Sequence, residues 1–469
     1  MGADLRAEAA RLVQSYQAEL EELAQWCLQQ GLADEAQQTR SWLVHRDPYK
    51  IYVIQLPVEV GPAPPPENLS PQAVEWYRRL QSLKQRQADR LFDLARRAIR
   101  SRQASLAFDL VMAALRENPD HAGIRRLLGY QRYRGQWRTA YEADRLRKGQ
   151  LWDDQFGWLP RSHVRRYHRG ERYYRGRWIS AQQDAQLRAD IHTGWDVETE
   201  HYRVRTNHSI QAGVRLATRL EELYRVWKQL FIRYYATADQ VAALFDASPR
   251  ATRIRRMRPI QHRVVYFRDR QAYNQALQHV FPNIEISVGV YLDQSRTAYF
   301  FADDESDDRT LLHEATHQLF HETRPVASAV GRDHNFWIIE GVAMYMETLR
   351  TEDGYHVVGG FDDDRIVAAR YRLLHDGFYV PLAELTSYGM AKLQSDPRIR
   401  TLYSQAAGLA HFLVHYDGGR YRDALVAYLR AVYTGQDDPN TLVRLTGTSY
   451  SQLDQQYRQY MKAAGPAAQ

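Results

Sequence analysis

The sequence predicts an α+β protein, in which a mostly helical N-terminal region is followed by a domain of a few strands and then many helices. Two observations predict this class. Apolar residues recur with helical spacing through about the first 130 residues and again after residue 305. Between residues 195 and 301, alternating and β-preferring residues replace that spacing. A strand-rich segment followed by helices is typical of the α+β class.

Length and composition narrow the possible functions. A chain of 469 residues predicts two or three domains, and 44% hydrophobic with 25% charged residues is typical of a soluble globular protein. The net charge of +7 comes mainly from scattered Arg, with concentrations at 161–177 and 250–258, which argues against nucleic acid as a partner. The single cysteine, Cys27, excludes a thiolate zinc cluster. Any metal would therefore be held by His and carboxylate.

The chain has no apolar run long enough to span a bilayer, so we expect no transmembrane segment. Its first residues, Met1 to Arg6, begin an amphipathic pattern and lack the apolar stretch of a signal peptide. We therefore expect a soluble protein. The compartment stays open, because a signal could have been removed before export.

The helical N-terminal region is expected to cover residues 1–130. Residues 5–45 predict a helical hairpin broken at Gly31, and the proline-rich residues 57–71 predict an extended linker. Ser70 and Pro71 are typical of an N-cap and a first helical turn. The helices that follow resemble a tetratricopeptide-type pair weakly. Two interpretations stay open, a module that binds a protein partner and plain helical packing.

A connector rich in Tyr, Trp and Arg is expected over residues 131–194. It contains a short repeat, Tyr133-Arg-Gly-Gln-Trp137 and Tyr174-Arg-Gly-Arg-Trp178. The Gly between Arg and Trp indicates a tight turn between short extended pieces. Such aromatic residues can stack on bases or glycans, but structural packing is the favoured interpretation because no nucleic-acid-binding module surrounds them.

The remaining domain is expected over residues 195–469. Strands are predicted at 201–206 and 263–267, with a long helix to about residue 236 between them and a helix at 271–280 after them. Two more strands, 288–292 and 298–301, are joined by a predicted hairpin turn at 293–296. All residues after 305 are expected to be helical.

The strongest chemical signal is His313-Glu314-Ala315-Thr316-His317, which lies inside a helical pattern. Two histidines four residues apart project from one helix face, so both imidazoles can reach a single ion. Glu314 lies beside them, within reach of a water on that ion. This pattern predicts zinc-dependent hydrolysis.

A second predicted helix, residues 336–347, supplies a third ligand, Glu340. The small residues Gly341 and Ala343 would let the two helices approach closely. Three protein ligands leave the fourth position of one zinc ion per chain open for water, as in catalytic sites. His334 is the main rival to Glu340. His321 lies two turns from His313, roughly 12 Å away, which is too far to share the ion.

These two helices resemble those of the gluzincins, the thermolysin-like zinc metallopeptidases of the peptidase MA clan. The resemblance covers about residues 196–463 and is closest to uncharacterised bacterial proteins with this motif. It implies a zincin-like domain, a peptide or protein substrate, and Glu314 as the general base. The metzincin alternative fails because Thr323 stands where its third histidine would be.

The resemblance also implies roles for other residues. The edge strand before the zinc helix pairs with substrate in this clan, which points to Ala298, Tyr299, Phe300 and Phe301. Tyr403 is the expected oxyanion donor, with His411 as the alternative. Met344 stands where thermolysin-like members place an acidic residue that orients a zinc histidine, and Glu347 is expected to act there instead.

Two other interpretations stay open. The zinc domain could be a silent scaffold that only binds peptide, or zinc could be structural in an Arg-rich nucleic-acid binder. Glu314 argues against lost turnover, since a structural site does not need it. The acidic residues 303–308 are expected to stabilise the zinc helix N-terminus rather than to bind calcium, because they lack the spacing of an EF-hand.

Overall fold

The computed structural model describes residues 4–42, 46–60, 70–246, 260–281, 284–303 and 308–463. Residues 61–69 of the predicted linker, the basic residues 250–258 and the acidic residues 304–307 lie outside this part. Helices are mixed with small sheets, which confirms the α+β class. The chain divides into two compact units, one of Met1–Ala140, Ala236–Met257 and Thr351–His356, and one of Tyr141–Tyr235, Arg258–Arg350 and Val357–Gln469.

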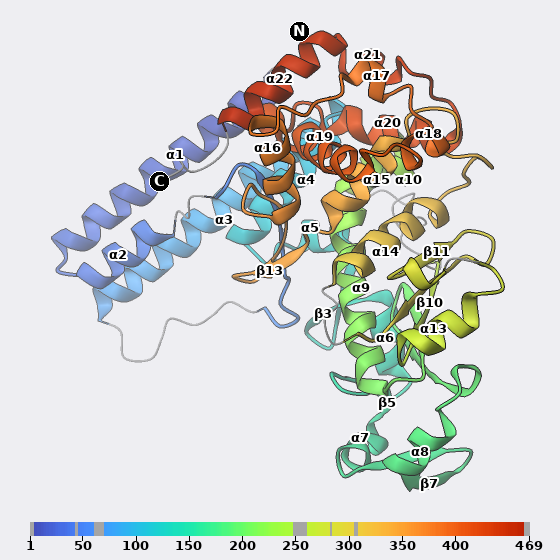
Figure 1. Ribbon diagram of the computed structural model, residues 1–469. Helices are drawn as coiled ribbons and strands as arrows, with labels where there is room; N and C mark the ends of the chain where they lie inside the picture. The colour runs from blue at the N-terminus through green and yellow to red at the C-terminus, as the bar shows by residue number, and fades with distance from the viewer. Residues whose placement is uncertain are drawn as a thin grey trace. The chain divides into compact units, whose positions relative to one another are not determined.

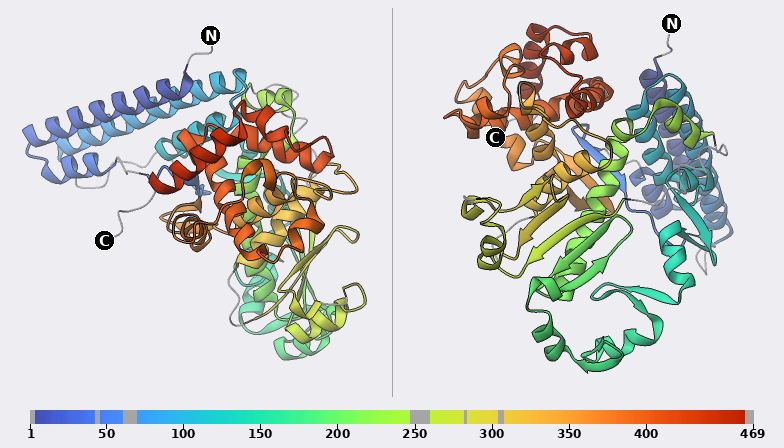
Figure 2. Two further views of the ribbon diagram at one scale, coloured as in Figure 1. Left: turned by 45° about the horizontal axis from the view of Figure 1, so that its top comes forward. Right: turned by 90° about the vertical axis from the view of Figure 1, so that its right-hand side faces the viewer.

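The first unit is mainly helical. Its helices are α1 (Leu5–Gln29), α2 (Ala33–Ser41), α3 (Pro71–Arg100), α4 (Ala104–Glu117), α5 (Ala122–Leu127) and α11 (Ala238–Phe245). The expected hairpin is confirmed by α1 and α2, which flank Gly31. Helices α1 and α3 lie side by side (Figures 1 and 2) and bury a shared apolar core that includes Leu20 and Trp76. As predicted, Ser70 caps α3 by accepting a hydrogen bond from the Ala73 N–H.

The connector forms three β-hairpins, each followed by a helix, where the sequence suggested two related turns. The elements are β2 (Tyr130–Tyr133), β3 (Gln136–Thr139), α6 (Ala140–Arg147), β4 (Gln150–Asp153), β5 (Gly157–Pro160), α7 (Arg161–His168), β6 (Glu171–Tyr174), β7 (Arg177–Ser180) and α8 (Ala181–Leu187). Trp137, Trp158 and Trp178 occupy the same position in the three hairpins. The middle hairpin escaped prediction because it has no Arg-Gly pair at its turn.

The second unit contains a five-stranded mixed sheet with the strand order β11-β12-β10-β9-β8 (green and yellow strands in Figure 2). The strands are β8 (Trp195–Glu198), β9 (Tyr202–Thr206), β10 (His262–Phe267), β11 (Val290–Leu292) and β12 (Thr297–Phe301). Strands β9, β10 and β12 are parallel, while β8 and β11 pair antiparallel with their neighbours. The predicted hairpin between β11 and β12 is confirmed.

Helices cover both faces of this sheet. On one face α13 (Arg270–Leu277) packs Tyr273 and Leu277 against Phe267 and Phe301. On the other face lie α9 (Ile210–Leu230) and α14 (Arg309–Glu322), and the Glu322 carboxylate receives a 2.8 Å hydrogen bond from His262 of β10. Alternate residues of β12 therefore face α14, the helix that carries both histidines of the motif.

Helices cover most of the C-terminal part, but the prediction that all of it is helical was wrong. The helices are α10 (Ile232–Tyr235), α15 (Phe336–Met346), α16 (Asp364–Leu374), α17 (Leu382–Leu385), α18 (Met390–Gln394), α19 (Ile399–Gly419), α20 (Arg422–Thr434), α21 (Thr441–Thr446) and α22 (Tyr450–Ala463). Strands β13 (Arg350–Glu352) and β14 (Tyr355–Gly359) interrupt them and form a sheet with β1 (Lys50–Ile54). Asp353 and Gly354, both at positive φ, are the hairpin-turn signal that was overlooked. Among the described helices, none is long and apolar enough to cross a membrane.

Candidate metal centre

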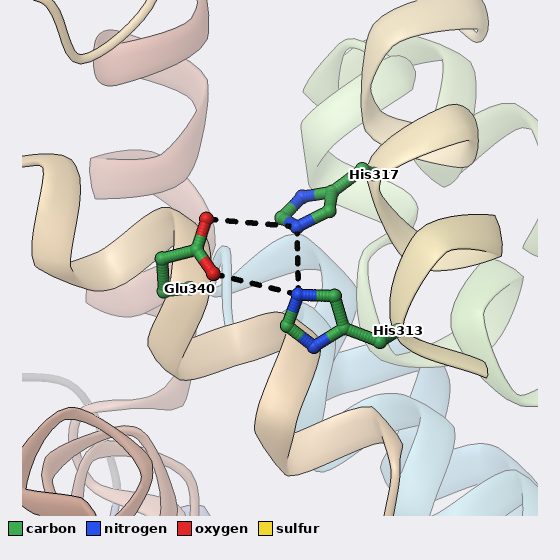
Figure 3. Close-up of side chains that lie close together, drawn as sticks. All are labelled: His313, His317 and Glu340. Atoms are coloured by element: carbon green, nitrogen blue, oxygen red, sulfur yellow. Dashed lines mark hydrogen bonds and ion pairs between the residues drawn. The ribbon is translucent and has the colours of Figure 1, made fainter. Parts of the chain in front are cut away.

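Three side chains from two helices converge on one point (Figure 3). His313 and His317 come from α14 and Glu340 comes from α15. The two Nε2 atoms are 3.1 Å apart, and they lie 3.4 and 3.7 Å from the two carboxylate oxygens of Glu340. Ligands about 2.0–2.1 Å from a tetrahedral zinc ion are separated by roughly 3.3 Å. With one ligand atom from each residue, the three atoms lie within 4.8 Å of one another, so the three side chains could share one metal ion after a small adjustment.

The glutamate helix α15 is packed differently from the prediction. A Cβ on Gly341 would lie 2.7 Å from the Ala406 carbonyl oxygen, which belongs to α19 and not to α14. Gly341 therefore allows the close approach of α15 to the helix that carries Tyr403. The expectation that Gly341 brings the two metal-binding helices together was wrong, because a helical glycine faces only one neighbour and this one faces α19.

Glu314 is held beside the triad by the sheet edge. The backbone N–H of Tyr291 in β11 donates a 3.0 Å hydrogen bond to its Oε2 atom. A Cβ on Gly289 would lie 2.9 Å from side-chain atoms of Phe300 and of Thr310 in α14, so this glycine lets β11 lie close to the helix. Burial of Glu314 raises its pKa to about 7, although His313 and the Tyr291 N–H oppose the rise. A group with this pKa can accept a proton near neutral pH.

Without a metal ion, the pKa values of the three side chains of the triad shift in different directions. Burial disfavours a charged His313, but hydrogen bonds to Glu340 and Glu347 outweigh it and raise the pKa of His313 to about 10. Burial lowers the pKa of His317 to about 4, against the attraction of Glu340. Burial would raise the pKa of Glu340, but the hydrogen bond from His313 and the charges of both histidines lower it. A metal ion would have to displace the proton on His313.

Glu347 lies against His313, as its expected role requires. Its Oε1 atom is 2.7 Å from His313 Nδ1. This contact places a proton on Nδ1 and turns Nε2 toward His317 and Glu340, where it can bind a metal ion once its own proton has been displaced. Met344, one turn after Glu340, is buried and offers no carboxylate.

The two oxyanion candidates differ in their surroundings. Burial raises the pKa of Tyr403, and the nearby carboxylates of Glu340 and Glu314 raise it further. His411 is buried elsewhere, with Nε2 accepting the Gly360 N–H at 3.2 Å and Nδ1 bound to Tyr460 at 2.8 Å. Both ring nitrogens of His411 are occupied, so the alternative donor is excluded.

His334 does not join the triad. Its Nδ1 atom lies 2.9 Å from a carboxylate oxygen of Asp437, which also accepts a 2.7 Å hydrogen bond from the Asn335 amide. Asp308 does not cap α14 with its side chain, and instead accepts a 2.9 Å hydrogen bond from Arg219. The expected side-chain cap is therefore wrong for Asp308, which still stands at the N-cap position of α14, and residues 304–307 lie outside the described residues.

The predicted substrate strand needs a correction. Ala298, Tyr299 and Phe300 belong to β12, which lies between β11 and β10 and is not an edge. Ala298 and Phe300 are buried. The edge strand next to the site is β11, which was overlooked as the edge because the order of strands in a sheet depends on long-range pairing.

Tyr433 of α20 is a second candidate for the oxyanion donor, and the sequence did not suggest it. It is fully buried, and its ring packs against His321 at 5.4 Å, one turn after His317. Its hydroxyl has no hydrogen-bond partner in the described part of the chain. Burial, Tyr234 and then Glu340 raise its pKa. No local pattern connects a residue so far along the chain to this site.

Comparison with known proteins adds one finding. Residues 308–437 match the family model described as "Protein of unknown function (DUF1570)". The matched segment runs from the start of α14 past the end of α20, and it contains the triad, Glu314 and Tyr403. A comparison with curated proteins gives no match.

Proposed function

We propose that this chain is a zinc-dependent peptidase with a zincin-like domain, in which His313, His317 and Glu340 bind one zinc ion. The observation that carries the proposal is the convergence of two Nε2 atoms, 3.1 Å apart, with the Glu340 carboxylate, whose two oxygens lie 3.4 Å from His313 and 3.7 Å from His317. A half-buried carboxylate, Glu314, lies beside them and is hydrogen-bonded to the edge strand of the sheet. A purely structural site would not need this group.

The chain's own residues would act on the water and on the substrate. Bound zinc supplies Lewis acidity, which lowers the pKa of water and polarises a carbonyl group. Glu314 would take a proton from the attacking water and deliver it to the leaving amine. Tyr403 would donate a hydrogen bond to the carbonyl oxygen as negative charge develops on it.

The open edge of the sheet suits an extended substrate. Strand β11 pairs only with β12 among the described strands, so its other side can pair with a peptide. The Tyr291 N–H, which now contacts Glu314, lies on that side. A peptide on β11 would therefore pass beside the general base, which supports peptide hydrolysis as the reaction.

Removal of the metal tests the proposal. We expect the purified full chain to cleave members of a broad peptide library, to lose this activity when a chelator removes zinc, and to regain it when one equivalent of zinc is added. Cleavage is measured by mass spectrometry. If the chain binds zinc but cleaves no peptide, the site is a binding scaffold and the proposed activity is wrong.

Two Tyr→Phe substitutions, each of which removes one hydroxyl group, test the oxyanion donor. We expect Tyr403→Phe to lower kcat by about 10²–10³-fold, because the hydroxyl would act mainly in the transition state. Tyr433→Phe removes the same atom from Tyr433, the rival candidate, and we expect it to change kcat by less than about tenfold. Zinc content and kcat are measured for both variants. A larger loss in Tyr433→Phe would transfer the donor role to that residue.

A further inference from the structure

We propose that Arg365 is a positioning residue for the zinc site, acting through Glu347 on His313. This inference rests on the proposed function, since it concerns the same metal. Arg365 lies in the first turn of α16, and its Nε atom donates a 2.7 Å hydrogen bond to Glu347 Oε2. The other oxygen, Oε1, is 2.7 Å from His313 Nδ1. Three helical segments are thus joined by two short contacts to one carboxylate.

The burial of Glu347 explains why the second contact matters. The Glu347 side chain is 3% exposed, so its charge needs partners inside the protein. His313 alone would satisfy one oxygen and leave the carboxylate free to turn about its bond. Arg365 occupies the other oxygen and thereby fixes the direction of the contact with His313. Because that contact sets which imidazole nitrogen faces the metal, Arg365 would raise zinc affinity without touching the ion.

Arg365 is itself fixed in place. Its backbone N–H donates a 2.9 Å hydrogen bond to the Asp363 carboxylate, which caps the start of α16. Its side chain is 44% exposed, so water partly screens the ion pair, and the buried Glu347 carboxylate keeps His313 as a partner at 2.7 Å when Arg365 is removed, which limits the loss of stability in the metal-free fold. A positioning role and a structural role therefore predict different results.

Zinc affinity is the measurement that separates the two roles. Zinc is titrated into the metal-free full chain in competition with a chromophoric chelator. We expect Arg365→Ala to weaken zinc binding by about 10–100-fold. The melting temperature of the metal-free protein should change by no more than about 3 °C. The matched control is Arg372→Ala in the same helix, which breaks a 2.6 Å hydrogen bond to Asp376, and its zinc affinity should equal that of the wild type.

A double-mutant cycle tests whether Arg365 acts through Glu347. Glu347→Gln should weaken zinc binding, and adding Arg365→Ala to it should cause no further loss. Losses that multiply would overturn the proposed path through Glu347. Wild-type zinc affinity in Arg365→Ala would overturn the inference alone, because the wild type would still bind zinc. A wild type with no affinity for zinc would overturn both this inference and the proposed function.

Discussion

Replacing Glu314 by glutamine is expected to lower kcat by about 10²–10⁴-fold while one zinc ion stays bound, because an amide cannot accept the proton of the attacking water. Gln has the same shape as Glu, and its amide oxygen can still accept the 3.0 Å hydrogen bond from the Tyr291 N–H. Glu314 is not one of the three ligands, so zinc affinity should be kept. The test is steady-state kinetics on a cleaved library peptide together with the zinc content.

The control for this prediction is Glu285→Gln, which removes one negative charge from an exposed position before β11. Its kcat should match that of the wild type. A Glu314→Gln enzyme that keeps a tenth or more of the wild-type kcat would rule out Glu314 as the base. The pH profile gives a second check. Because Glu314 acts as a carboxylate and burial raises its pKa to about 7, activity should fall as pH decreases, and bound zinc should move this limb below pH 7.

Removing the third ligand has the largest effect expected on metal binding. Glu340→Ala should weaken zinc binding by more than the roughly 100-fold upper limit typical of residues that only support a ligand. The imidazoles of His313 and His317 would remain as ligands, but the negative charge of the Glu340 carboxylate, which partly neutralises the zinc ion, would be lost. Glu340 is buried beside both histidines, so the surrounding protein shields the vacated position from the solvent. Zinc affinity is measured by competition with a chelator.

His334→Ala is the matched control, since His334 was the rival ligand and lies six residues before Glu340. Because His334 pairs with Asp437 at 2.9 Å, its loss should leave zinc affinity unchanged. Full affinity in Glu340→Ala together with a loss in His334→Ala would reverse the assignment of the third ligand.

The parts of the fold that could be predicted depend on local patterns. Helical spacing located α1, α3, α9 and α14, and alternation located β9, β10 and the β11–β12 hairpin. The order of strands in the sheet could not be predicted, because the paired residues of β10 and β12, such as Arg263 and Thr297, are 34 positions apart in the sequence. The same limit hid the pairing of β14 with β1, which lie about 300 residues apart.

In the candidate site, too, the residues related by local spacing could be predicted and those brought together by long-range packing could not. His313, Glu314 and His317 are related by one helical turn, so their shared face follows from the sequence alone. Glu340 was expected from a second helix, and the structure brings it to the two histidines. Arg365 and Tyr433 were missed because only the packing of α16 and α20 brings them near. Gly341 was expected to face α14 but faces α19. A small residue in a sequence indicates that its helix approaches another closely, but it does not show which helix that is.

All the roles proposed for this site depend on a single zinc ion bound between His313, His317 and Glu340. The most direct measurement is anomalous diffraction at the zinc edge from crystals of the full chain grown with one equivalent of zinc. We expect one anomalous peak about 2.0–2.1 Å from both Nε2 atoms and from a carboxylate oxygen of Glu340. A peak at another position, or no peak between these three side chains, would contradict it.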